Sequence, residues 1–98
     1  MLKGLQKKQI EYYKEGDIEK VGVLRFLISA IKNKEIELRP KGEDLTDEMV
    51  FRILKKQIKM RVDAIGEAEK ANRNDLTTKE TKEKIFLEEI LEEFFPNG

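Results

Sequence analysis

Cysteine and histidine are both missing from the 98 residues of this chain. Without cysteine, the chain forms neither a disulfide framework nor a thiolate metal site or nucleophile. Without histidine, it lacks the commonest general base and metal ligand of proteins. These two absences exclude a Ser-His-Asp or Cys-His catalytic set, and also the Glu-x-x-His pair of the common di-iron helical bundles.

Long apolar runs and glycine-rich loops are missing too. No apolar run approaches the roughly 18 residues that a membrane-spanning helix needs, and no signal-peptide core follows Met1. The six glycines are scattered, so they form no phosphate-binding loop. We therefore expect a cytoplasmic domain that makes no membrane contact and has no cofactor, no metal site and no catalytic residue. An enzyme built on carboxylates alone is the one catalytic alternative left open.

Charged residues are what the chain has in excess. They make up 41% of the sequence, against about a quarter in an ordinary domain, and hydrophobic residues make up 39%. This composition predicts long helices with solvated faces. The net charge is zero, but residues 1–62 carry +5 and residues 63–98 carry −5. The asymmetry indicates either an acidic partner for the basic half or packing of the two halves against each other.

Apolar residues recur at helical spacing in four segments. The predicted helices cover about residues 1–15, 18–39 and 47–71, and a fourth that begins near Asp75 or Thr77 and ends before Pro96. No stretch of useful length has the alternation of a strand. Because short connections favour antiparallel neighbours, we predict an all-α, four-helix antiparallel bundle-like domain that occupies residues 1–98. The second and third helices are expected to form its main hairpin.

The predicted helix ends rest on residues with known capping preferences. Gly16 suits the left-handed position that ends a helix, and Asp17 is a good first cap for the next one. Pro40 ends the second helix, because the residue before a proline is pushed out of the helical region. Residues 40–45 are then expected to form a surface loop. Two alternatives stay open at each end of the third helix: Thr46 or Asp47 as its first cap, and Asn72 or Asn74 in the left-handed position after it.

One face of the third predicted helix is basic. Arg52, Lys55, Lys56 and Lys59 fall within about 100° of one another on the helical wheel, and no acidic residue occurs between residues 49 and 62. Such a face makes salt-dependent contacts with the phosphates of a nucleic acid, or it is only the solvated face of an amphipathic helix. On the second helix, Lys32 and Lys34 are candidates to extend the same surface.

Two polar residues interrupt the apolar face of the third helix. Gln57 and Arg61 lie one turn apart where the helical period requires apolar side chains. A buried guanidinium needs a carboxylate partner, because an unpaired buried charge costs several kcal/mol. Glu35, which falls in the apolar stripe of the second helix, is the candidate partner. Gln57, Arg61 and Glu35 are therefore expected to organise the bundle.

The last predicted helix has more apolar surface than one helix contact requires. Phe86 and Phe95 broaden its main apolar stripe, and Ile85 lies on the far side of the helix. Exposed apolar patches mark interaction sites. Either the first helix covers these residues, or they dock a partner protein.

Several segments resemble the GatB/YqeY family, in the same order and spacing over nearly the whole chain. Residues 69–76 resemble the family's EKAGREDL turn, with Asn72 where glycine is usual, and residues 91–96 are similar to its LEEYLP ending. Asp17 and residues 23–27 and 30–37 resemble the family's second helix. Residues 45–48 and 56–59, with Arg61 and Ile65, resemble its third helix.

The resemblance implies a four-helix part followed by a smaller three-helix part, of which this chain has only the first. It also implies kinship with the tail of the B subunit of the tRNA-dependent amidotransferase, a carbon–nitrogen ligase that uses glutamine as its nitrogen donor. That tail engages tRNA and carries no catalytic chemistry. The implied partners are tRNA and a component of an amidotransferase or of an aminoacyl-tRNA synthetase.

Overall fold

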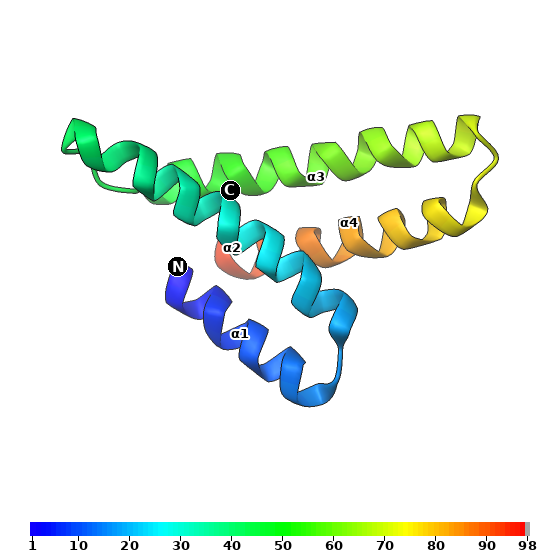
Figure 1. The fold of residues 1–98 in the computed structure, drawn as a ribbon, viewed down its shortest axis with the longest axis horizontal. Helices are drawn as coiled ribbons and strands as arrows, with labels where there is room; N and C mark the ends of the chain where they lie inside the picture. Colours follow the sequence, from blue (N-terminus) through cyan, green and yellow to red (C-terminus); the bar gives the residue numbers. More distant parts are fainter. Residues whose placement is uncertain (98) are drawn as a thin grey trace. The chain divides into compact units, whose positions relative to one another are not determined.

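The computed structural model describes residues 1–97, and every regular element in them is a helix (Figure 1). This confirms the all-α prediction and its four helices. The elements are α1 (Leu2–Glu15), α2 (Ile18–Leu38), a short 3₁₀ turn η1 (Arg39–Lys41), α3 (Asp47–Lys70) and α4 (Asn74–Phe94). Within the described residues, no helix combines the length and the hydropathy that crossing a bilayer requires.

The helices end where the capping residues predict. Gly16 is left-handed, with φ 78°, and Asp17 then accepts a hydrogen bond of 3.2 Å from the backbone N–H of Lys20. Of the two candidates before α3, Thr46 is the cap, since its hydroxyl accepts from the backbone N–H of Met49 at 3.2 Å. After α3, Asn72 takes the left-handed position with φ 56°.

The connection between α2 and α3 is more ordered than an irregular loop. α2 stops at Leu38, and Arg39, Pro40 and Lys41 form η1 before Gly42 turns the chain with φ 67°. Proline fits this position because its fixed φ suits the first turn of a helix, where its missing N–H leaves no bond unmade. The irregular loop between α2 and α3 is therefore shorter than the predicted loop over residues 40–45.

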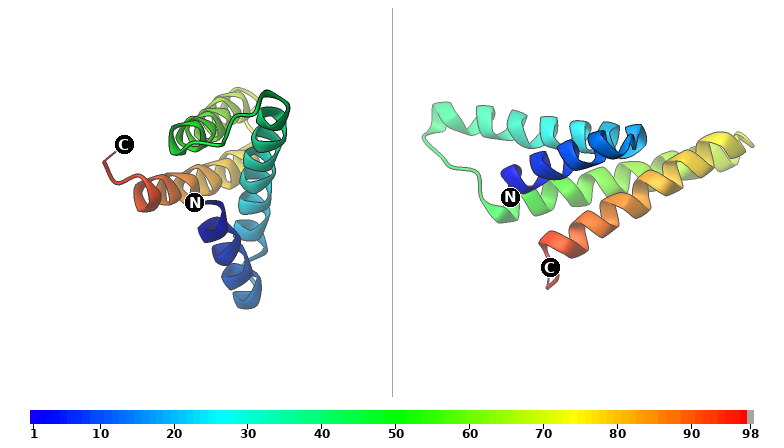
Figure 2. Two further views of the ribbon diagram at one scale, coloured as in Figure 1. Left: turned by 90° about the vertical axis from the view of Figure 1, so that its left-hand side faces the viewer. Right: turned by 90° about the horizontal axis from the view of Figure 1, so that it is seen from below.

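The chain divides into two compact units, and the first is Met1–Ile53. In it, α1 and α2 run antiparallel and side by side (Figures 1 and 2). α2 supplies most of the buried apolar side chains and α1 supplies Leu5. The buried residues of α2 are Val21, Val23, Leu24, Leu27, Ile28, Ile31 and Leu38.

The second unit is Leu54–Gly98, and in it α3 and α4 form another antiparallel hairpin (Figures 1 and 2). Leu54 and Ala68 of α3 are buried, as are Phe86, Leu87 and Ile90 of α4. The hairpins inside the units are thus α1–α2 and α3–α4. The expected hairpin of the second and third helices would involve both units, so it stays a prediction. The single domain over residues 1–98 also stays a prediction.

Candidate nucleic-acid interface

The basic residues of α3 all lie on its exposed side. Arg52, Lys55, Lys56 and Lys59 are each exposed along one continuous helix. The spacing of 3.6 residues per turn brings these four side chains to one face. The predicted face therefore exists as a local feature of α3.

Acidic residues neutralise both ends of this basic face. Arg52 forms an ion pair with Glu48, with 2.7 Å between nitrogen and oxygen, and Lys59 lies 3.7 Å from Asp63. Both acids lie one turn away and just outside the acid-free stretch seen in the sequence. In the part of the chain that the structure describes, Lys55 and Lys56 have no ion-pair partner. These two lysines carry the uncompensated charge of the face.

The two candidate lysines of α2 differ from each other. Lys32 is exposed, whereas Lys34 is half-buried and lies 3.8 Å from Glu37. Both belong to the first unit, and Lys55, Lys56 and Lys59 belong to the second. That Lys32 and Lys34 extend the α3 face stays a prediction.

Of the two polar residues on the inner side of α3, Gln57 is buried and Arg61 is half-buried, and the structure shows acidic partners for Arg61 that its sequence position did not indicate. Arg61 Nε lies 2.9 Å from Glu83 Oε2 and 3.5 Å from Glu80 Oε2, both on α4. Both acids stand on the side of α4 that faces α3, which helical-wheel phasing of α4 could have indicated. Glu35 belongs to the other unit, so its pairing with Arg61 stays a prediction.

Gln57 is 7% exposed, and its Oε1 atom accepts no hydrogen bond from any residue of the described range 1–97. A buried amide oxygen without a donor costs about 1–3 kcal/mol. Together with Arg61, this residue gives α3 a polar inner stripe. Residues 55–65 thus form two faces of α3. Lys55 and Lys56, whose charges are uncompensated, lie on the outer face, and Gln57 and Arg61 lie on the inner face.

The three apolar candidates of the last helix do not form one exposed patch. Ile85 is 48% exposed, but Phe86 is only 4% exposed and Phe95 is half-buried. Phe86 is therefore part of the core, and its candidacy as an exposed docking residue is wrong. Its helical position, 100° from Ile85, brings it to the buried side of α4.

The structure thus defines a class: an all-α domain of antiparallel helical hairpins, with a basic outer face on α3. The family model of the Yqey-like proteins matches residues 2–98, and the chain belongs to this family. A segment of 65 residues is 40% identical to the protein of Kluyveromyces lactis called "Altered inheritance of mitochondria protein 41, mitochondrial". The match covers 66% of this chain and 34% of that protein, so the chain spans about a third of its relative.

Proposed function

We propose that this chain is a non-catalytic accessory domain that contacts tRNA through the outer face of α3. One observation carries the proposal: Lys55 and Lys56 are exposed neighbours without an acidic partner among the described residues. Lysines compensated by acids on their own helix are weak phosphate ligands, whereas uncompensated ones release counterions from RNA on binding. Lys59 and Arg52 flank them and exchange their acids for phosphates.

The chemistry of the face favours phosphates over base edges. Lysine side chains on the outside of a helix are point charges that contact phosphates without reading base sequence. The expected contact is therefore weak, salt-dependent and independent of base sequence. The domain then serves by holding tRNA while another component, of an amidotransferase or an aminoacyl-tRNA synthetase, performs the chemistry. A cytoplasmic location also stays a prediction, because the name of the relative from Kluyveromyces lactis assigns that protein to mitochondria.

A second candidate function rests on α4. Ile85 is the large apolar side chain of that helix that is most exposed, at 48%, and a partner protein covers such a residue. In this alternative, the chain is a protein-interaction module without a nucleic-acid role. The buried Phe86 and half-buried Phe95 reduce the apolar surface that α4 offers to such a partner.

The two functions are separated by a binding experiment with purified tRNA at low and moderate salt. One variant carries Lys55→Glu, Lys56→Glu and Lys59→Glu. Its matched control carries Lys3→Glu, Lys7→Glu and Lys14→Glu, three exposed lysines of α1 with the same total charge change. We expect the α3 variant to lose on the order of tenfold in affinity or more, and the control to lose much less.

The outcomes of this experiment are distinct. If both variants lose the same affinity, the contact is not on α3 and only net charge attracts the RNA. If binding ignores both salt and charge reversal, the phosphate-contact proposal is wrong and docking through α4 gains support. Circular dichroism of both variants confirms that the helices are intact.

A further inference from the structure

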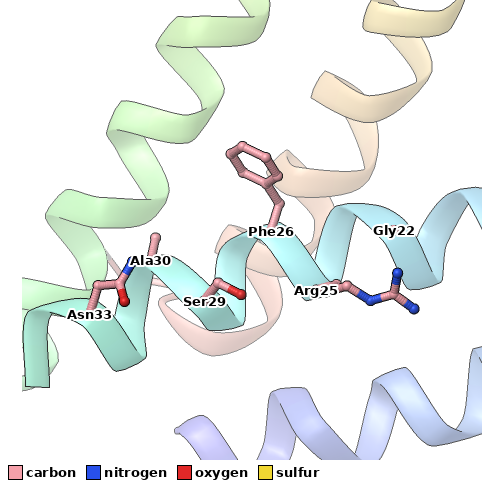
Figure 3. Close-up of a pocket in the computed structure, with 6 residues that line it drawn as sticks. All are labelled: Gly22, Arg25, Phe26, Ser29, Ala30 and Asn33. Atoms are coloured by element: carbon pink, nitrogen blue, oxygen red, sulfur yellow. The ribbon is translucent and has the colours of Figure 1, made fainter. Parts of the chain in front are cut away.

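The outer face of α2 is hollowed. A depression of about 460 Å³ is lined by six residues of this helix alone: Gly22, Arg25, Phe26, Ser29, Ala30 and Asn33 (Figure 3). Its floor is low because three of the six side chains are absent or small. Exposed apolar side chains stand at both ends of the same face, since Ile18 is 67% exposed and Ile36 is 56% exposed.

The six lining residues follow the spacing by which one helix receives another. A knob from a facing helix enters a hole formed by four residues at positions i, i+3, i+4 and i+7. Gly22, Arg25, Phe26 and Ser29 make one such hole. Phe26, Ser29, Ala30 and Asn33 make the next, one turn further on. This face is therefore shaped for a helix, and aliphatic ends such as Ile18 and Ile36 favour a protein over RNA.

Gly22 gives independent support for a close partner. A glycine inside a helix is less stable than alanine, so it is expected where a partner backbone approaches. A Cβ atom added at Gly22 meets no atom within 4 Å, so packing within the chain does not require a glycine there. An external helix over this position gives the glycine a structural reason.

The charges on this face select the occupant. Arg25 and Lys32 are exposed and lie two turns apart, about 10.5 Å along the helix, with no ion pair to either in the described residues. A second α2 packed here brings like charges together and is disfavoured. The occupant therefore carries acidic residues around an apolar knob.

The outer face of α4 has this chemistry. Ile85 is exposed, and Glu88, Glu89 and Glu92 follow it on the same face at i+3, i+4 and i+7. Glu88 lies 3.8 Å from Lys84, whereas Glu89 and Glu92 have no basic partner in the range 1–97. We propose that α4 of a second copy of this chain docks on α2, with Ile85 in the hollow and Glu89 and Glu92 beside Arg25 and Lys32.

The test is sedimentation equilibrium of the whole chain, from micromolar to about millimolar concentration. One variant carries Arg25→Glu and Lys32→Glu on α2, and another carries Glu89→Lys and Glu92→Lys on α4. Each variant alone should weaken self-association by about tenfold or more, because like charges then face each other. A mixture of the two variants should restore association, because each reversed α2 meets an α4 of opposite charge.

A second pair of variants tests the hollow itself. Gly22→Leu fills the first hole and should weaken self-association. Gly66→Leu is its matched control, since Gly66 is also an exposed mid-helix glycine with open space at its Cβ position. A wild-type chain that stays monomeric over the whole range overturns the proposal. So does a mixture of charge-reversed variants that fails to associate while each variant keeps its helical content. The result does not depend on whether the chain binds tRNA.

Discussion

Arg61 of α3 and Glu83 of α4 meet across their hairpin, with 2.9 Å between Nε and Oε2. Glu80, one turn earlier on α4, lies 3.5 Å from the same nitrogen. The side chains of all three residues are largely withdrawn from water, at 14%, 16% and 20% exposure. One guanidinium thus compensates two carboxylates between the two helices of the second unit. Removing the Arg61 guanidinium leaves the two carboxylates of Glu80 and Glu83 largely shielded from water and without a compensating charge.

Arg61→Met should therefore lower the free energy of unfolding by about 2–4 kcal/mol, because the two glutamates lose their shared partner. Urea denaturation followed by circular dichroism measures this difference. Lys59→Met is the control, since Lys59 and Asp63 form an exposed ion pair whose loss costs less than about 1 kcal/mol. Equal losses for the two variants would show that the Arg61 pair contributes no more than a surface contact.

Gly22→Ala should act in the opposite direction. The added methyl group meets open space, and alanine favours the helix by about 1 kcal/mol. The same substitution at Gly16 should destabilise the chain, because Gly16 has φ 78°, which a side chain disfavours. Thermal unfolding of both variants measures the two signs. A destabilised Gly22→Ala chain would mean that α2 is more crowded at this point than the structure shows.

Arg73 and Asp75 form a local pair at the start of α4 that should be visible by pH titration. The Arg73 side chain donates two hydrogen bonds of 3.2 Å to the Asp75 carboxylate, and this lowers the pKa of Asp75 below its ordinary value. Because the folded-state pKa is depressed, the stabilisation is present above the unfolded-state pKa and is lost as the pH falls through the folded-state pKa. Carbon-detected NMR titration of Asp75 should show a rise in its pKa in the Arg73→Gln variant. An unchanged pKa would contradict the assigned cause.

The sequence predicted the helices well because their signals are local. Gly16, Asp17 and Asn72 act through their own backbone and their immediate neighbours, so a capping preference is sufficient to locate them. The apolar period likewise predicted a helix over about residues 18–39, where α2 covers Ile18–Leu38. The ordering of residues 39–41 into η1 was missed, because a single 3₁₀ turn has little periodicity to detect.

Contacts between helices were harder to predict. The sequence indicated that Arg61 is buried and needs a carboxylate, but it offers many acids at helical spacing. Glu35 and the pair Glu80 and Glu83 are equally plausible until the hairpin partner of α3 is known. Similarly, the sequence leaves open whether Phe86 is covered or exposed, because the width of an apolar face does not reveal what covers it. Arg52 and Lys59 lie inside an acid-free stretch of sequence, but Glu48 and Asp63 border that stretch and reach them from one helical turn away.

The proposed function requires that Lys55 and Lys56 contact RNA phosphates. The most direct measurement is the dependence of the tRNA association constant on salt concentration, for the wild type and for a variant with Lys55→Ala and Lys56→Ala. We expect the slope of log K against log salt to become shallower by about 1.4–1.8, because two phosphate contacts are lost and each contributes about 0.7–0.9. Equal slopes and equal affinities in the two proteins would contradict the claim.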